Sequence, residues 1–242
     1  MMKKSLILFS LFIFSFEVFP QTQQFFDSPF GGGGGFTPGW TFVNVSSLNN
    51  KLSSINMPQV AKNGIFTTGG GGFIYIGFVP GLRIGGMGCG GSTSAKSAVT
   101  NAIGEFMYNA ETLYSTGGGG VTIEYTLPFI KSIGVSPGLI IGGGNITVEL
   151  YKNNGVNYWD ELGTPSVLHN TLNNNFWMIA PTVNVEIPFY RFFCFRIGAG
   201  YNFTLSEKWT LNNDQSIVNV PSDFNGRNFF IQTGIFVGFF SF

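Results

Sequence analysis

Long segments of this chain repeat an apolar side chain at every second position, and this repeat restricts the fold more than any other feature. Over 192–206, aromatic and aliphatic residues alternate with small, polar or charged ones. The same repeat runs through 117–127 and 176–188. Successive side chains of a β-strand point to opposite faces. Each segment is therefore predicted to be a strand with one apolar and one polar face.

The predicted strands are long and the chain is poor in charge, which favours a lipid environment. We place strands at 67–77, 82–92, 117–127, 134–151, 176–188, 192–206 and 228–242. Most exceed the about 5–6 residues of a typical globular strand and reach the roughly 9–11 residues of a tilted membrane strand. Only 10% of the residues are charged, against about 25% in soluble domains. Apolar faces of this length form patches that soluble monomers rarely carry, so we expect them to face lipid.

Short and long connections alternate between these strands. Tight turns are predicted at 79–81, 129–132 and 189–191, and long polar segments at 93–116, 152–175 and 207–226. Short periplasmic turns that alternate with longer outer loops are typical of outer-membrane barrels, whose strands are even in number. The strands placed so far are odd in number, so residues 36–45 are predicted to supply one more. The prediction is an all-β fold, an antiparallel up-and-down transmembrane β-barrel of eight strands; a hairpin within 97–114 would instead raise the number to ten.

The N-terminal region is predicted to precede the barrel. Lys3 and Lys4 are followed by an apolar run that is too short for a membrane helix, which needs about 20 residues. Residues 1–21 are therefore interpreted as a cleaved signal peptide. Residues 22–39 are rich in glycine and are interpreted as a flexible lead-in. The barrel itself is predicted to occupy 36–242.

A different period interrupts the strands near the start of the barrel. Leu48, Leu52 and Ile55 fall at the spacing of one helix face. A short amphipathic helix is predicted over 46–56, within the first outer loop.

The chain ends in an aromatic segment, Phe236-Val237-Gly238-Phe239-Phe240-Ser241-Phe242. With the signal peptide and the alternating strands, this segment resembles the small outer-membrane β-barrel proteins of the opacity/OmpA-like type. The resemblance implies a C-terminal signal, with a final aromatic residue and apolar residues at alternate positions, that the barrel-assembly machinery reads. In this sequence, the positions that match the signal are Phe230, Phe236, Phe240 and Phe242. The resemblance also implies an outer-membrane location, but no activity.

A set of charged residues lies on the strand faces opposite the apolar ones, and we expect these residues to point into the lumen. They are Arg83, Glu124, Glu149, Glu186 and Arg196. An eight-stranded barrel is just wide enough for side chains to fill it, and buried charges must pair because lone ones are costly. The hypothesis is an ionic and hydrogen-bonded network that plugs the barrel. The alternatives are a pore lining and a catalytic pair of carboxylates.

Other motifs predict no cofactor, metal or nucleic-acid site. Residues 86–91 satisfy G-x-G-x-x-G, but a dinucleotide fingerprint must open a helix inside a βαβ unit. His169 is the single histidine and cannot alone build a metal site or a triad. Cys89 and Cys194 both fall on inward faces, so a disulfide bond between them is one alternative and two small core residues are the other. Lys plus Arg and Asp plus Glu each number 12, so no basic surface predicts nucleic-acid binding.

The sequence therefore predicts a location and an architecture more than an activity. We expect a monomeric barrel in outer-membrane lipid, without enzymatic activity, whose filled interior and outer loops serve a structural or surface-interaction role. One alternative is a small channel for solutes. A further alternative is a soluble secreted barrel that binds an apolar ligand.

Overall fold

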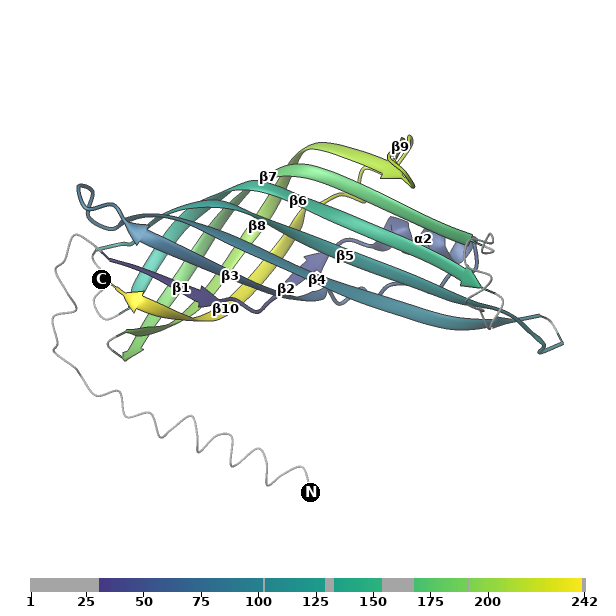
Figure 1. Cartoon of the computed structure of the whole chain (residues 1–242), viewed down its shortest axis with the longest axis horizontal. Helices are drawn as coiled ribbons and strands as arrows, with labels where there is room; N and C mark the ends of the chain where they lie inside the picture. Colours follow the sequence, from purple (N-terminus) through teal and green to yellow (C-terminus); the bar gives the residue numbers. More distant parts are fainter. Residues whose placement is uncertain (1–30, 102, 129–132, 154–167, 191, 241–242) are drawn as a thin grey trace, which may run out of the picture.

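The chain folds as a closed barrel (Figure 1); the computed structural model describes residues 31–101, 103–128, 133–153, 168–190 and 192–240. Its strands are β1 (Gly32–Phe36), β2 (Gly39–Val43), β3 (Ile65–Tyr75), β4 (Leu82–Thr100), β5 (Phe106–Tyr125), β6 (Gly134–Asn153), β7 (Leu168–Tyr190), β8 (Phe193–Leu211), β9 (Gln215–Ser216) and β10 (Asn228–Phe239). Neighbouring strands are antiparallel, and β10 pairs with β8 on one side and with β1 and β2 on the other, which closes the ring. Because β1 and β2 are two halves of one wall strand and β9 lies outside the ring, the wall has eight strands. The predicted eight-stranded up-and-down barrel is confirmed.

The first wall strand begins earlier than predicted. Gly32–Phe36 was expected within the flexible lead-in, but it pairs with both β3 and β10 and forms β1. The strand is interrupted at Pro38, which has no N–H to donate to the sheet, and it resumes as β2. The predicted signal peptide at 1–21, the first part of the lead-in and Phe242 lie outside the described residues.

The wall is much taller on one side of the barrel. β4 to β8 contain 19 to 23 residues each, about twice the roughly 9–11 residues that cross a membrane. The segment 93–116, predicted as a loop, consists mostly of β4 and β5, which a short turn joins. Its Ser, Thr and Ala residues keep the strand pairing but lack the apolar repeat that revealed the other strands. Apart from the turn between β4 and β5, the short turns lie at the end of the barrel that holds the C-terminus, here called the turn end; the opposite end is the loop end (Figure 1).

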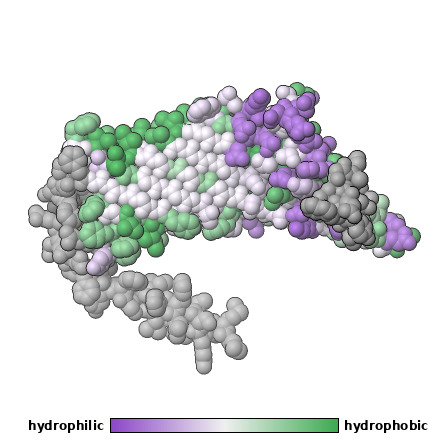
Figure 2. All heavy atoms as spheres, in the orientation of Figure 1, coloured by the Kyte–Doolittle hydropathy of each residue, from purple (hydrophilic) through white to green (hydrophobic). Residues whose placement is uncertain are grey.

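The two halves of the wall have opposite polarity. Near the turn end the outward side chains are apolar, as in β7, where Trp177 is 67% and Val183 52% exposed. Near the loop end the outward side chains of the same strand are polar, from Asn175 to His169. Figure 2 shows this change from a surface with apolar patches to a hydrophilic one. In β6 the inward Val148, near the loop end, is fully buried. The wall therefore resembles that of a membrane barrel near the turn end and that of a water-soluble barrel near the loop end.

Helix α2 (Ser46–Ser54) lies within the loop-end half and explains why the interior there is apolar (Figure 1). It is two residues shorter than the predicted 46–56. Leu48 and Leu52 are buried in one cluster with inward residues of β5 and β6, such as Tyr114 and Val148. Lys152 of β6 donates a hydrogen bond from Nζ to the carbonyl oxygen of Ile55, at the C-terminus of the helix, over 2.7 Å. Within the described part of the chain, no helix has the length and hydropathy to cross a bilayer.

Candidate functional site

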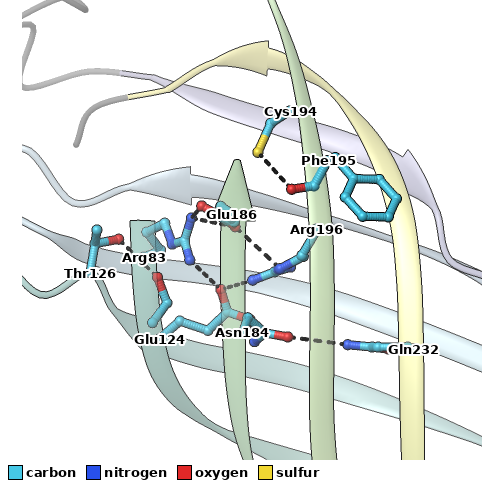
Figure 3. Close-up of polar contacts among 10 residues, drawn as sticks. Arg83, Glu124, Thr126, Asn184, Glu186, Cys194, Phe195, Arg196 and Gln232 are labelled. Atoms are coloured by element: carbon cyan, nitrogen blue, oxygen red, sulfur yellow. Dashed lines mark hydrogen bonds and ion pairs between the residues drawn. The ribbon is translucent and has the colours of Figure 1, made fainter. Parts of the chain in front are cut away.

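Four of the charged residues predicted to face the lumen come together in the turn-end half. Arg83 and Glu124 are direct cross-strand partners on β4 and β5, and Glu186 and Arg196 on β7 and β8. Their side chains point toward one another across the lumen (Figure 3). Arg83 has no exposed surface and Arg196, the most exposed of the four, retains 7%. The four strands therefore place two guanidinium groups and two carboxylates in one buried cluster, here called the ionic network.

Each guanidinium in the network contacts both carboxylates. Arg83 Nη1 donates to the two oxygens of Glu186 at 2.7 and 2.9 Å, and its Nη2 lies 2.9 Å from Glu124 Oε2. Arg196 Nη2 donates to Glu124, and its Nε lies 3.2 Å from Glu186 Oε1. The Nη2 contact of Arg83 and the Nε contact of Arg196 are ion pairs outside hydrogen-bond geometry. The network is neutral as a whole, which is the condition under which buried charges persist.

Amide and aromatic side chains surround the ionic network. Asn184 Nδ2 donates to Glu124 Oε1 at 3.1 Å, and Gln232 Nε2 donates to Asn184 Oδ1 at 3.4 Å (Figure 3). The Arg83 guanidinium lies 4.3 Å from the centre of the Phe73 ring, a distance at which cation–π attraction acts. Asn184 alternates with the apolar residues of 176–188 and so lies on the polar face of its strand, but the sequence does not indicate its partners, which come from β5 and β10.

Small residues make room for the network. A Cβ on Gly138 would lie 2.8 Å from Glu124 Cγ, and one on Gly198 would lie 2.2 Å from Asn184 Oδ1. Neither position can therefore carry a side chain without moving a member of the network or its amide shell.

Glu149, the fifth predicted member, is not part of the network. Its neighbours Val148 and Leu150 face inward and are buried, so Glu149 points outward, where it accepts a hydrogen bond from the Tyr151 hydroxyl. The prediction was wrong because it took the apolar face of a strand to be the outward face along its whole length. In the loop-end half of β6, the apolar face points inward and packs in the cluster that includes α2.

Three of the phenylalanines assigned to the C-terminal signal also face inward. Phe230, Phe236 and Phe240 are 8%, 1% and 2% exposed. Phe236 and Phe240 form a buried cluster with Phe73, Tyr75 and Cys194 that packs against the ionic network. The outward apolar residues of β10 are the alternate set that includes Phe229, Ile231, Ile235, Val237 and Phe239. The assembly signal itself stays a prediction.

Two small cavities lie in the lumen between the described strands. A cavity of about 10 Å³ lies beside the ionic network, and one of about 40 Å³ lies nearer the loop end, lined partly by Cys89 and Phe176. A buried water needs at least about 10–15 Å³, so neither cavity is larger than the space of a few water molecules. Cys89 and Cys194 are both free thiols. In the described ranges, no group of His, Cys, Asp or Glu is placed to hold a metal ion.

The sequence matches no family model and no curated protein. Among solved structures, the chain is similar to a major outer membrane protein of Thermus thermophilus, with 9% identity and a TM-score of 0.44 over 86% of this chain and 99% of that one. It is also similar to Ail of Yersinia pestis, with 7% identity and a TM-score of 0.44 over 87% and 97%. The outer membrane protease OmpT of Escherichia coli shares 11% identity, with a TM-score of 0.32 over 87% and 96%. All three are outer-membrane proteins, the class that the sequence resembles, and at this distance the likeness carries no function over.

Proposed function

We propose that this chain is a non-conducting outer-membrane barrel that holds a polar sheet above the membrane for contacts outside the cell. The observation that carries the proposal is the filling of the lumen at two levels. The ionic network and its aromatic cluster occupy the turn-end half, and α2 with its apolar contacts occupies the loop-end half. Neither of the two lumen cavities lined by described residues has room for a solute the size of an amino acid.

The outward surface supports the membrane location. In β7 the outward apolar residues extend from Trp177 to Phe189. Twelve residue steps of about 3.3 Å each, tilted by roughly 40°, give a band about 30 Å tall, comparable to the apolar band of outer-membrane barrels. By the same measure, the wall from Trp177 to His169 rises about 20 Å beyond the band. The turn end then lies on the periplasmic side and the tall wall outside the cell.

The proposal assigns no catalytic role to the buried carboxylates. Glu124 and Glu186 each contact two guanidinium groups, so their oxygens are already engaged and cannot take a proton from a substrate. The likeness to OmpT is a likeness of fold.

Conductance and labelling test the proposal together. The refolded protein is expected to shift its mobility on unheated gels and to carry no steady current in a planar lipid bilayer. A Ser94→Cys variant in a Cys89→Ser/Cys194→Ser background should react with an impermeant maleimide on intact cells, because Ser94 faces outward on the tall wall. A steady current whose ion selectivity changes in Arg196→Glu would show that ions pass the network and would refute the proposal.

A further inference from the structure

The outer face of the tall wall carries a row of polar side chains that the barrel itself does not need. Lys96, Glu111, Tyr151 and His169 are successive cross-strand partners on β4, β5, β6 and β7. All four point outward, because the inward neighbours Ala110 and Leu150 are buried. This row therefore faces the exterior about eight residues above the apolar band, where no lipid covers it.

A groove lies over this row. It has a volume of about 530 Å³ and is lined mainly by Lys96, Asn109, Glu111, Tyr151 and Asn153. Ligand pockets typically measure about 300–1,000 Å³, so the groove is large enough for a small molecule. The amide oxygen of Asn153 is shielded from solvent and has no hydrogen-bond partner in the structure. Turning the Asn153 amide toward the groove would give this oxygen a partner in a ligand hydroxyl.

The aromatic part of the row is held rigid. The rings of Tyr151 and His169 stack with centroids 4.7 Å apart and planes 19° apart. The Tyr151 hydroxyl donates to Glu149, which raises the pKa of Tyr151 to about 12. Because the phenol stays neutral and fixed, its ring offers a flat apolar surface beside hydrogen-bonding groups.

The charge of the groove argues against anionic ligands. The ammonium of Lys96 is paired with Glu111 at 3.2 Å, and Glu149 adds a further carboxylate. A sulfated or phosphorylated ligand would therefore meet a site without a free cation. A flat ring, amides and a carboxylate together fit the ring faces and hydroxyl groups of sugars.

We propose that this groove binds a neutral oligosaccharide, with a sugar ring packed on Tyr151 and its hydroxyls bonded to Asn109, Glu111 and Asn153. The inference rests on the proposed function, since it requires that this face of the sheet lie outside the cell. It names the ligand class for the contacts proposed there.

Binding is measured by saturation-transfer NMR and titration with maltotriose and with N,N′,N″-triacetylchitotriose, on protein in a phosphocholine detergent that contains no sugar. We expect at least one trisaccharide to bind. Tyr151→Ala should weaken binding by roughly tenfold, the ratio expected for the loss of one aromatic contact. Asn109→Ala should also weaken it, whereas Asn175→Ala, an outward asparagine outside the groove, should not. Tyr151→Phe keeps the ring and should retain most of the affinity, which separates loss of the ring from loss of the Glu149 contact.

Gel mobility of unheated samples shows that each variant is folded before binding is compared. The proposal is overturned when neither trisaccharide binds, when Tyr151→Ala binds as the wild type does, or when dextran sulfate alone binds. None of these outcomes contradicts the proposed function, which stands if the barrel does not conduct and Ser94→Cys is labelled on intact cells. A selective current would overturn the proposed function by a separate route.

Discussion

Replacing Arg83 by Met tests whether the ionic network is dry and closed. The Arg83 side chain is fully buried and lies 2.7 Å from Glu186 and 2.9 Å from Glu124. Without it the two carboxylates share only Arg196, so one buried negative charge has no counterpart. Removing one partner of a buried ion pair typically costs about 3–5 kcal/mol, a large part of the about 5–15 kcal/mol that stabilises a folded domain. We expect Arg83→Met to lower the free energy of unfolding by about that amount.

The assay is equilibrium unfolding by urea in phospholipid vesicles, followed by tryptophan fluorescence and by the mobility of unheated samples. Lys96→Met is the control, because its pair with Glu111 is 71% exposed on the lysine side and exposed pairs contribute only about 0–1 kcal/mol. The double variant Arg83→Met/Glu186→Gln restores neutrality and should recover part of the loss. Equal small losses in Arg83→Met and Lys96→Met would refute the reasoning, since they would mean that water screens the network.

Three further predictions concern packing. Gly142→Ala should prevent folding, because its Cβ would lie 2.0 Å from the Gly119 carbonyl oxygen, whereas Gly88→Ala, with 3.8 Å to its nearest neighbour, should fold normally; gel mobility distinguishes them. Lys152→Met should loosen α2 and speed hydrogen exchange over 46–54, because it removes the hydrogen bond from the Lys152 ammonium to the Ile55 carbonyl oxygen, while Lys51→Met, which removes an exposed cation of the last turn, should have a much smaller effect. Val148→Asp should lower the urea midpoint sharply and Glu149→Val should not, because Val148 alone is buried.

The alternation in the sequence was sufficient to predict the wall near the turn end. There the membrane requires apolar side chains outside, so the opposite face of each strand had to be the inner one. This reasoning placed Arg83, Glu124, Glu186 and Arg196 inside, where the structure has them. It could not pair them, because their partners are set by which strands face each other across the closed ring.

The same reasoning failed near the loop end because the outer solvent changes there. Glu149 was assigned to the lumen from the apolar Val148 and Leu150 beside it, but these two pack inward in the cluster that includes α2. β8 adds a second difficulty. Ser206 has a positive φ of 54°, and the pairing with β7 shifts register between Leu205 and Lys208. The inward face of β8 therefore changes there from even to odd positions. The residues around this bulge have no apolar repeat, so nothing in the sequence indicates it.

The contents of the lumen follow from what surrounds the wall. Where lipid lies outside, the polar residues are left for the interior, and a lumen too narrow for bulk water forces them to pair, as the ionic network does. Where water lies outside, the apolar residues turn inward and need an apolar filler, which Leu48 and Leu52 of α2 provide. Between the two regimes the wall carries paired glycines, Gly118 to Gly120 opposite Gly142 to Gly144. Because glycine has no side chain, neither face of the wall is apolar or polar at that level. One continuous strand can therefore have its apolar face outward on one side of the glycines and inward on the other.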